Sequence, residues 1–164
     1  MFRLITLILY FSYLCQAGES CCADNPKIRY FLGGRKVNWT AAIKSCQDVG
    51  MSLVSIQYKE KSDQITQFLK STGVNYDSYE NAIWSSGNRL QDKINWFWLA
   101  RDPVKFTNWD TQNKEPNNAG GNEECISIYK NGANTVWNDI ACNREYYPLC
   151  EKSMCCPVTN IALN

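Results

Sequence analysis

Two clusters of oxygen-bearing side chains near the C-terminal end of the chain limit how it can fold. The clusters lie about 20 residues apart, and their carboxylates and amides are Glu115, Asn117, Asn122, Glu123, Glu124, Asn138 and Asp139. Calcium prefers roughly six to eight such oxygens at ~2.3–2.6 Å, supplied from loops. The 164 residues include no histidine, which argues against zinc or copper here. The sequence therefore predicts that both segments fold back to share one calcium ion.

Residues 1–17 have the features of a secretory signal peptide. Arg3 supplies the positive charge, residues 4–11 form an apolar run, and Cys15-Gln16-Ala17 provides a small-residue cleavage site. A membrane anchor is the alternative, but the apolar run ends near Leu14 and is shorter than the ~20 residues that a span requires. We expect a secreted, extracellular and soluble protein with no membrane insertion.

Eight of the nine cysteines follow this leader: Cys21, Cys22, Cys46, Cys125, Cys142, Cys150, Cys155 and Cys156. An even number in a secreted chain favours disulfides, although the spacing alone does not give the pairing. No Cys-x-x-Cys pair is present, so zinc binding is the weaker interpretation. Without the leader the chain has 16 basic and 16 acidic residues, and this balance argues against a surface for nucleic acid or anionic membranes.

The hydrophobic pattern indicates two helices followed by many short strands, an order that is typical of α+β proteins. It predicts strands over 28–32 and 53–56 and helices over 40–49 and 60–70. Thr40 is the expected N-cap of the first helix, and Gly50 and Gly73 are the expected stops. After Tyr79 the chain consists of short strands between Gly, Asn, Asp and Pro residues.

One domain is expected over 28–152, between a short N-terminal segment at 18–27 and a tail at 153–164. No repeat or linker interrupts this span. The loops over 88–122 are long for a compact domain, and loops of this length need internal organisation or a function. A bound cation would organise them, because converging carboxylates would otherwise repel one another.

Five of the six tryptophans lie after Tyr79. Trp109 and Trp137 are expected to pack in the core beneath the loops rather than to form platforms for sugar stacking. Trp96 and Trp98 alternate as neighbouring strand residues do, so one of the two can be exposed. The pattern leaves open which one.

Several short motifs occur in an order that is typical of one family. They are Leu53-Val54-Ser55-Ile56 after a cysteine-bearing helix, Phe106-Thr107-Asn108-Trp109, Glu115-Pro116-Asn117, Asn122-Glu123-Glu124-Cys125, Trp137-Asn138-Asp139, Cys142 and Tyr147-Pro148-Leu149-Cys150-Glu151. Over residues 28–152 the chain resembles the C-type lectin domain. The resemblance implies an α+β fold of two helices with small antiparallel sheets and a long calcium-binding loop region, stapled by disulfides. The chain departs from the family where Ile83-Trp84-Ser85-Ser86-Gly87 replaces Trp-Ile-Gly-Leu.

The resemblance also implies two disulfides, Cys46–Cys150 and Cys125–Cys142. The first would tie the first helix to the last strand, and the second would staple the calcium-binding loops. The remaining cysteines form two adjacent pairs, Cys21 with Cys22 and Cys155 with Cys156. Because the chain ends lie close together in this fold, one pair can join the other within the chain. The alternative is intermolecular disulfides that give dimers or oligomers.

The family's principal calcium site corresponds to five residues of this chain: Glu115, Asn117, Glu123, Asn138 and Asp139. Related domains also hold the bond that matches Glu115–Pro116 in cis. Asn122 then falls outside the ligand set. An auxiliary calcium site would correspond to Asn88, Asp92, Asn118 and Glu124. Two of these four are amides where carboxylates are commoner, and fewer negative charges predict a weaker site.

In the family, Glu-Pro-Asn accompanies sugars with equatorial 3- and 4-hydroxyls, such as mannose and N-acetylglucosamine, and fucose through an analogous pair. The resemblance therefore implies a lectin that binds mannose-type glycans through calcium, most naturally in innate immune recognition. A protein-binding or ice-binding use of the same fold is the alternative. An enzyme is not expected, because the chain has no histidine and its carboxylates stand beside amides rather than in isolated apolar settings.

Asn38-Trp39-Thr40 is the one N-glycosylation sequon of the chain. It lies at the start of the first predicted helix, where Asn38 is expected at the surface. Thr40 is also the expected cap of that helix, so the sequence leaves open whether Asn38 carries a glycan.

Overall fold

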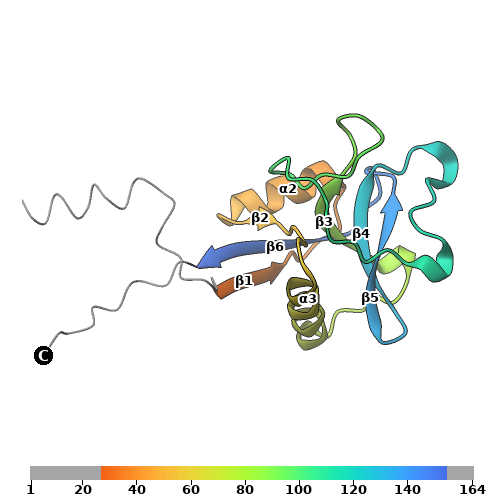
Figure 1. The fold of residues 1–164 in the computed structure, drawn as a ribbon. Coiled ribbons are helices and arrows are strands. Elements are labelled where there is room, and N and C mark those ends of the chain that lie inside the picture. Colours follow the sequence, from red (N-terminus) through yellow and green to blue (C-terminus); the bar gives the residue numbers. More distant parts are fainter. Residues whose placement is uncertain (1–26, 155–164) are drawn as a thin grey trace, which may run out of the picture. The chain divides into compact units, whose positions relative to one another are not determined.

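The computed structural model describes residues 27–154, which form two α-helices and six β-strands (Figure 1). In chain order these are β1 (Lys27–Leu32), α2 (Trp39–Asp48), β2 (Ser52–Leu53), α3 (Lys59–Thr72), β3 (Ile83–Asn88), β4 (Cys125–Asn131), β5 (Asn134–Ile140) and β6 (Tyr147–Met154). The connections contain three short 3₁₀ helices, η1 (Tyr79–Asn81), η2 (Thr111–Asn113) and η3 (Ala119–Gly121). The predicted α+β class is confirmed, and Tyr30–Lys152 form one compact unit.

Some predictions from the sequence concern residues outside 27–154. They are the signal peptide at 1–17, the segment before residue 27, the tail after residue 154, and the pairing of Cys21, Cys22, Cys155 and Cys156. Among the residues that the structure describes, no helix is long and apolar enough to cross a membrane.

Helix α2 begins after Asn38 rather than at a cap formed by Thr40. The backbone of Asn38 is extended, and its side-chain oxygen accepts a hydrogen bond from the backbone N–H of Ala41 at 2.9 Å. The predicted cap at Thr40 is therefore wrong, because Thr40 already lies in the first helical turn and the stronger cap residue Asn38 precedes it. The capping side chain is that of the sequon asparagine, and glycosylation at Asn38 stays a prediction.

Helix α3 covers the predicted range and extends beyond it at both ends. Gly73 stops it in the left-handed conformation at φ 69°, which glycine adopts without a Cβ clash. Ile65 and Leu69 are fully buried on its inner face. Lys61 is also buried and forms an ion pair with Glu151 of β6 at 2.6 Å. Apolar packing and a charged pair therefore both hold α3 in place.

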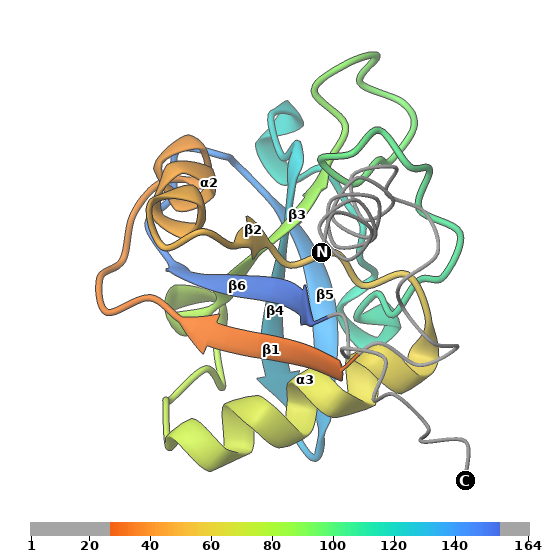
Figure 2. The same cartoon turned by 90° about the vertical axis from the view of Figure 1, so that its left-hand side faces the viewer.

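The strands follow the order β1-β6-β3-β4-β5, and β2 pairs with β6. Figures 1 and 2 show α2 and α3 on opposite sides of β6. The pairs β3–β4 and β4–β5 are antiparallel, as expected, but β3 runs parallel to β6. The structure thus adds a parallel pair to the small antiparallel sheets that were expected. This contact is short, and Pro148 within it has no N–H to donate.

The tryptophans of the second half pack beneath the loops. Trp137 is fully buried and makes edge-to-face contacts with Trp98, Phe106 and Trp109 at ring-centroid distances of 5.6–5.7 Å. Trp137 is therefore packed in the core, as predicted, whereas Trp109 is partly buried and packs against that core. Of the two residues left open, Trp98 is buried, whereas Trp96 is half-buried and packs against Trp109 at 5.2 Å.

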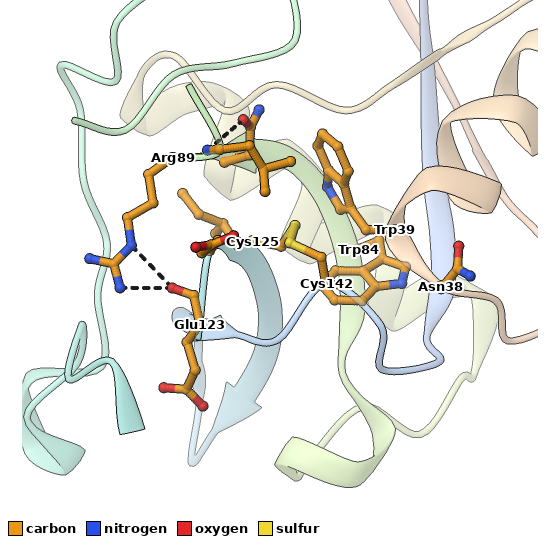
Figure 3. The surroundings of a disulfide bond; sticks show 12 residues. Asn38, Trp39, Trp84, Arg89, Glu123, Cys125 and Cys142 are labelled. Carbon is orange, nitrogen blue, oxygen red and sulfur yellow. Dashed lines mark hydrogen bonds between the residues drawn. A yellow bond between two sulfur atoms is a disulfide. The ribbon is translucent and has the colours of Figure 1, made fainter. Parts of the chain in front are cut away.

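Both disulfides implied by the family resemblance are present. Cys46–Cys150 joins α2 to β6 across a sequence separation of 104, and Cys125–Cys142 joins the start of β4 to the segment after β5 across a separation of 17. Glu123 lies two residues before Cys125, so the second disulfide anchors the strand end from which this carboxylate projects (Figure 3).

Candidate functional site

The connection between β3 and β4, residues 89–124, contains most of the candidate ligands and lies beside these strands (Figure 1). Backbone hydrogen bonds join Phe97 to Asn88 at the start of the connection, with both N···O distances 2.8 Å. Farther along, the N–H of Trp137 in β5 donates to the carbonyl of Asn108 at 2.8 Å. The protein itself therefore ties this long connection to β3 and β5.

Asp110, which the sequence analysis did not single out, organises the loop that presents Glu115. Its backbone carbonyl accepts a hydrogen bond from the N–H of Glu115 at 3.0 Å. Its buried carboxylate accepts hydrogen bonds from Gln112, Asn113, Tyr129 and Asn131. Burial opposes ionisation, but these hydrogen bonds hold the pKa of Asp110 below its ordinary value. The available signal was the run Asp-Thr-Gln-Asn, which is typical of an aspartate that caps a short helical turn.

The five predicted ligands of the principal calcium site come from three parts of the chain. Glu115 and Asn117 flank Pro116 in the loop, and the Glu115–Pro116 bond is cis, as the resemblance implied. Glu123 lies two residues before the start of β4, whereas Asn138 and Asp139 belong to β5. Glu115, Glu123, Asn138 and Asp139 are all buried, and Asn117 is exposed.

Hydrogen bonds link four of these five residues. Asn117 Nδ2 donates to Glu115 Oε1 at 3.0 Å, and the backbone N–H of Asn117 donates to Asp139 Oδ1 at 2.9 Å. The N–H of Ala119 donates to Glu123 Oε2 at 2.6 Å and to Asn117 Oδ1 at 2.7 Å. In this arrangement no three Asp, Glu, Cys or His side chains of residues 27–154 form a group that could hold a metal ion. A calcium ion would therefore have to replace some of these hydrogen bonds.

Three buried carboxylates, those of Glu115, Glu123 and Asp139, lie close enough to repel one another. Burial, together with the neighbouring Asp139 and Glu123, raises the pKa of Glu115 to about 7, and burial with Asp139 also raises the pKa of Glu123. Glu115 Oε2 is buried without a hydrogen-bond partner. Three carboxylates and two amides supply hard oxygens, and a cation would relieve both the crowding and the unpartnered oxygen. The residues present therefore fit calcium.

Without calcium, the domain should become less stable as the pH rises from about 4.5 to about 7. The folded protein binds the Glu115 proton more tightly than the unfolded chain does, because the pKa of Glu115 is raised to about 7 from 4.5. Raising the pH through this window therefore favours the unfolded state. Urea unfolding in EDTA at several pH values measures the effect. Glu115→Gln is the control, and an unchanged pH slope in that variant would contradict the prediction.

Asn88 and Asp92, two of the predicted auxiliary ligands, are engaged in local turns. Asn88 Oδ1 accepts a hydrogen bond from the N–H of Leu90 at 3.2 Å. The carboxylate of Asp92 accepts hydrogen bonds from the N–H of Ile94 at 2.9 Å and from both the N–H and the side-chain amide of Asn95 at 2.8 Å. These bonds hold the pKa of Asp92 below its ordinary value. Both side chains therefore stabilise the loop in which they lie.

Asn118 and Glu124, the other two predicted auxiliary ligands, also have partners. Asn118 Oδ1 accepts a hydrogen bond from the N–H of Glu123 at 3.0 Å. Glu124 forms an ion pair with Lys93 at 2.5 Å. The neighbouring Arg89 places its guanidinium on the carbonyl of Glu123, a contact that the sequence did not reveal. Lys93 thus pairs with one predicted auxiliary ligand, and Arg89 contacts the residue next to that ligand in the chain.

The comparison with known proteins decides the family. A family model described as Lectin C-type domain matches residues 35–152. The chain belongs to the C-type lectin domain family. Its domain is similar to a perlucin-like protein of Mytilus galloprovincialis, at 30% identity over 154 residues that cover 87% of this chain and 91% of the relative. A C-type lectin mannose-binding isoform of Oxyuranus scutellatus is 26% identical over 158 residues, covering 92% of this chain and 96% of the relative.

The C-type lectin fold is also shared with solved structures. The cow C-type carbohydrate-recognition domain of CD23, crystallised in the presence of a GlcNAc2Man3 oligosaccharide, matches with a TM-score of 0.65 at 25% identity. The match covers 84% of this chain and 97% of that chain. C-type lectin domains are non-enzymatic binding modules, so this chain is not an enzyme.

Proposed function

We propose that this C-type lectin domain binds mannose-type sugars through a calcium ion held by Glu115, Asn117, Glu123, Asn138 and Asp139. The observation that supports this most is that the carboxylates of Glu115, Glu123 and Asp139 are each buried, and that Glu115 Oε2 has no hydrogen-bond partner. Burying such a group without a cation is costly. Calcium would supply the compensating charge and the open coordination positions at which sugar hydroxyls replace water.

The pair Glu115 and Asn117 would choose the sugar. An ionised carboxylate only accepts hydrogen bonds, whereas an amide both donates and accepts. Glu115 can therefore accept a hydrogen bond from one hydroxyl, and Asn117 Nδ2 can donate to its neighbour. The existing bond from Asn117 Nδ2 to Glu115 Oε1 places the two groups side by side. We assign to this order, Glu115 before Asn117, sugars with equatorial 3- and 4-hydroxyls. Mannose and N-acetylglucosamine have such hydroxyls, and fucose has an analogous pair.

Two similarities support a sugar ligand. One relative carries the name mannose-binding isoform, and the CD23 domain was crystallised in the presence of an oligosaccharide that contains mannose and N-acetylglucosamine. We propose secretion through the leader at 1–17 and a role in innate immune recognition of glycans. Cys21, Cys22, Cys155 and Cys156 are the candidates for disulfides that link chains, and oligomers of this kind would raise avidity for clustered sugars.

Retention on immobilised mannose should require calcium and should be reversed by EDTA or by free mannose. One site of this type is expected to hold a monosaccharide with a Kd of order mM, about 4 kcal/mol, so the column needs a high ligand density. Immobilised galactose is the matched control and should retain little protein. Retention that resists both eluents, or no retention at all, would overturn the proposed function and favour a non-sugar use of the fold.

A further inference from the structure

Arg89 reaches from the end of β3 to the backbone beside the proposed calcium site. Its Nε and Nη2 atoms both donate to the carbonyl oxygen of Glu123, at 3.1 and 2.8 Å (Figure 3). Nη2 also lies 3.3 Å from Asp139 Oδ2. One guanidinium therefore contacts two of the five proposed ligands without belonging to the ligand set.

Several contacts hold this guanidinium in one position. Its central carbon lies over the ring of Trp96, 4.9 Å from the centroid, and the backbone N–H of Arg89 donates to the carbonyl of Glu124 at 2.9 Å. The side chain of Arg89 is only 14% exposed. A planar guanidinium that is stacked on an aromatic ring and doubly bonded to a carbonyl is well ordered. Arg89 is therefore a fixed cation rather than a mobile surface charge.

A second cation on the same loop behaves differently. Lys93 forms its ion pair with Glu124, but its side chain is 59% exposed. Exposed ion pairs of this kind contribute little, because water and salt screen them. Lys93 and Arg89 thus carry the same charge on neighbouring turns of one loop, and only Arg89 touches the proposed calcium ligands.

We propose that Arg89 takes the place of the auxiliary calcium ion and positions Glu123 and Asp139 for the principal one. The domain then binds one calcium ion rather than two. The inference rests on the proposed function, since it assigns Arg89 a part in building that same site. Arg89 is a positioning residue, because it acts through the ligands and does not contact the ion.

The charge of Arg89 and its position lead to opposite expectations for the calcium affinity of a variant that lacks it. If only charge mattered, removing a cation close to the site would strengthen calcium binding, because like charges repel. If position matters, Glu123 and Asp139 lose a directional partner and calcium binding weakens. Outer partners of metal ligands commonly change metal affinity by about 10–100-fold when they are removed. The direction of the change therefore separates the two explanations.

Calorimetric titration of the full secreted chain with calcium alone tests the proposal. We expect one ion per wild-type chain, at least about tenfold weaker binding in Arg89→Ala, and only partial recovery in Arg89→Lys, which keeps the charge but loses the planar fork. Lys93→Ala is the matched control, with an expected change of no more than about twofold. Two ions per wild-type chain, or equal effects of Arg89→Ala and Lys93→Ala, would overturn the inference.

Thermal unfolding in EDTA separates this inference from the proposed function. Arg89→Ala should unfold at a lower temperature than Lys93→Ala even without metal, because Arg89 also compensates the buried Asp139. A wild-type chain that binds no calcium would refute the proposed function and the positioning role together. A wild-type chain that binds calcium, with Arg89→Ala and Lys93→Ala equal in both assays, would refute the role of Arg89 alone.

Discussion

Exchanging Glu115→Gln together with Asn117→Asp should move the sugar preference of this domain from mannose to galactose. The exchange keeps a carboxylate on one side of Pro116 and an amide on the other, so the charge of the site and its number of side-chain oxygens stay the same. Only the order of acceptor and donor is reversed, and the family resemblance associates the reversed order, Gln-Pro-Asp, with galactose. Hydrogen bonds to charged groups contribute roughly 1.5–3 kcal/mol each, so misdirecting even one should reduce mannose affinity by at least about tenfold.

The measurement is calcium-dependent retention of both proteins on mannose and galactose columns, with calcium affinity determined in parallel. Glu115→Gln alone is the informative control, because it removes a carboxylate and should weaken calcium binding and both sugars together. A double variant that binds calcium normally and still prefers mannose would show that Glu115 and Asn117 do not select the sugar.

Replacing Cys46 and Cys150 with alanine should lower the stability of the domain more than replacing Cys125 and Cys142 does. In the chain-entropy model, closing a loop of about 100 residues contributes up to about 4.7 kcal/mol, and closing one of about 17 residues contributes about 3 kcal/mol. The observed separations of 104 and 17 residues correspond to these two cases. Cys46 and Cys150 also lie in the core between α2 and β6, so the alanines leave unfilled space.

Urea unfolding of both double variants, at one fixed excess of calcium, measures these losses. The Cys125→Ala and Cys142→Ala variant is the matched comparison and should also weaken calcium binding, because Cys125 anchors the strand end next to Glu123. The loss of Cys46–Cys150 should leave calcium affinity of the folded protein nearly unchanged. An equal or larger destabilisation by the shorter-loop variant would contradict the loop-length explanation.

The order of elements was predictable because the relevant signals are local in sequence. Gly73 stops α3 at the expected place, and Ile65 and Leu69, which are four residues apart, share the buried face of that helix. The error at the start of α2 has the same local origin, since Asn38 and Thr40 are both acceptable caps and only the path of the preceding chain selects Asn38. The parallel contact between β3 and β6 had no local signal, because it joins residues more than 60 apart in the sequence.

In the candidate site, too, residues with a local signal could be predicted, and contacts between distant residues could not. Glu115, Asn117 and Asp139 could be named in advance because their side chains offer oxygen in a recognisable order. The parts played by Asp110 and Arg89 could not. Asp110 is a capping aspartate whose partners Tyr129 and Asn131 lie about 20 residues away, and the contact of Arg89 is with a backbone carbonyl, which no side-chain pattern encodes.

The sequence by itself determined the class of fold, the family and the residues that can offer oxygen to a cation, because helix stops, cysteines and carboxylates keep their chemistry wherever the chain places them. Only the tertiary structure decided that Trp98 rather than Trp96 is buried, that β6 lies beside β3, and that Arg89 meets Glu123 and Asp139. These are contacts between distant segments. Their geometry depends on how the whole core packs, and packing is a property of the assembled fold rather than of any one stretch of sequence.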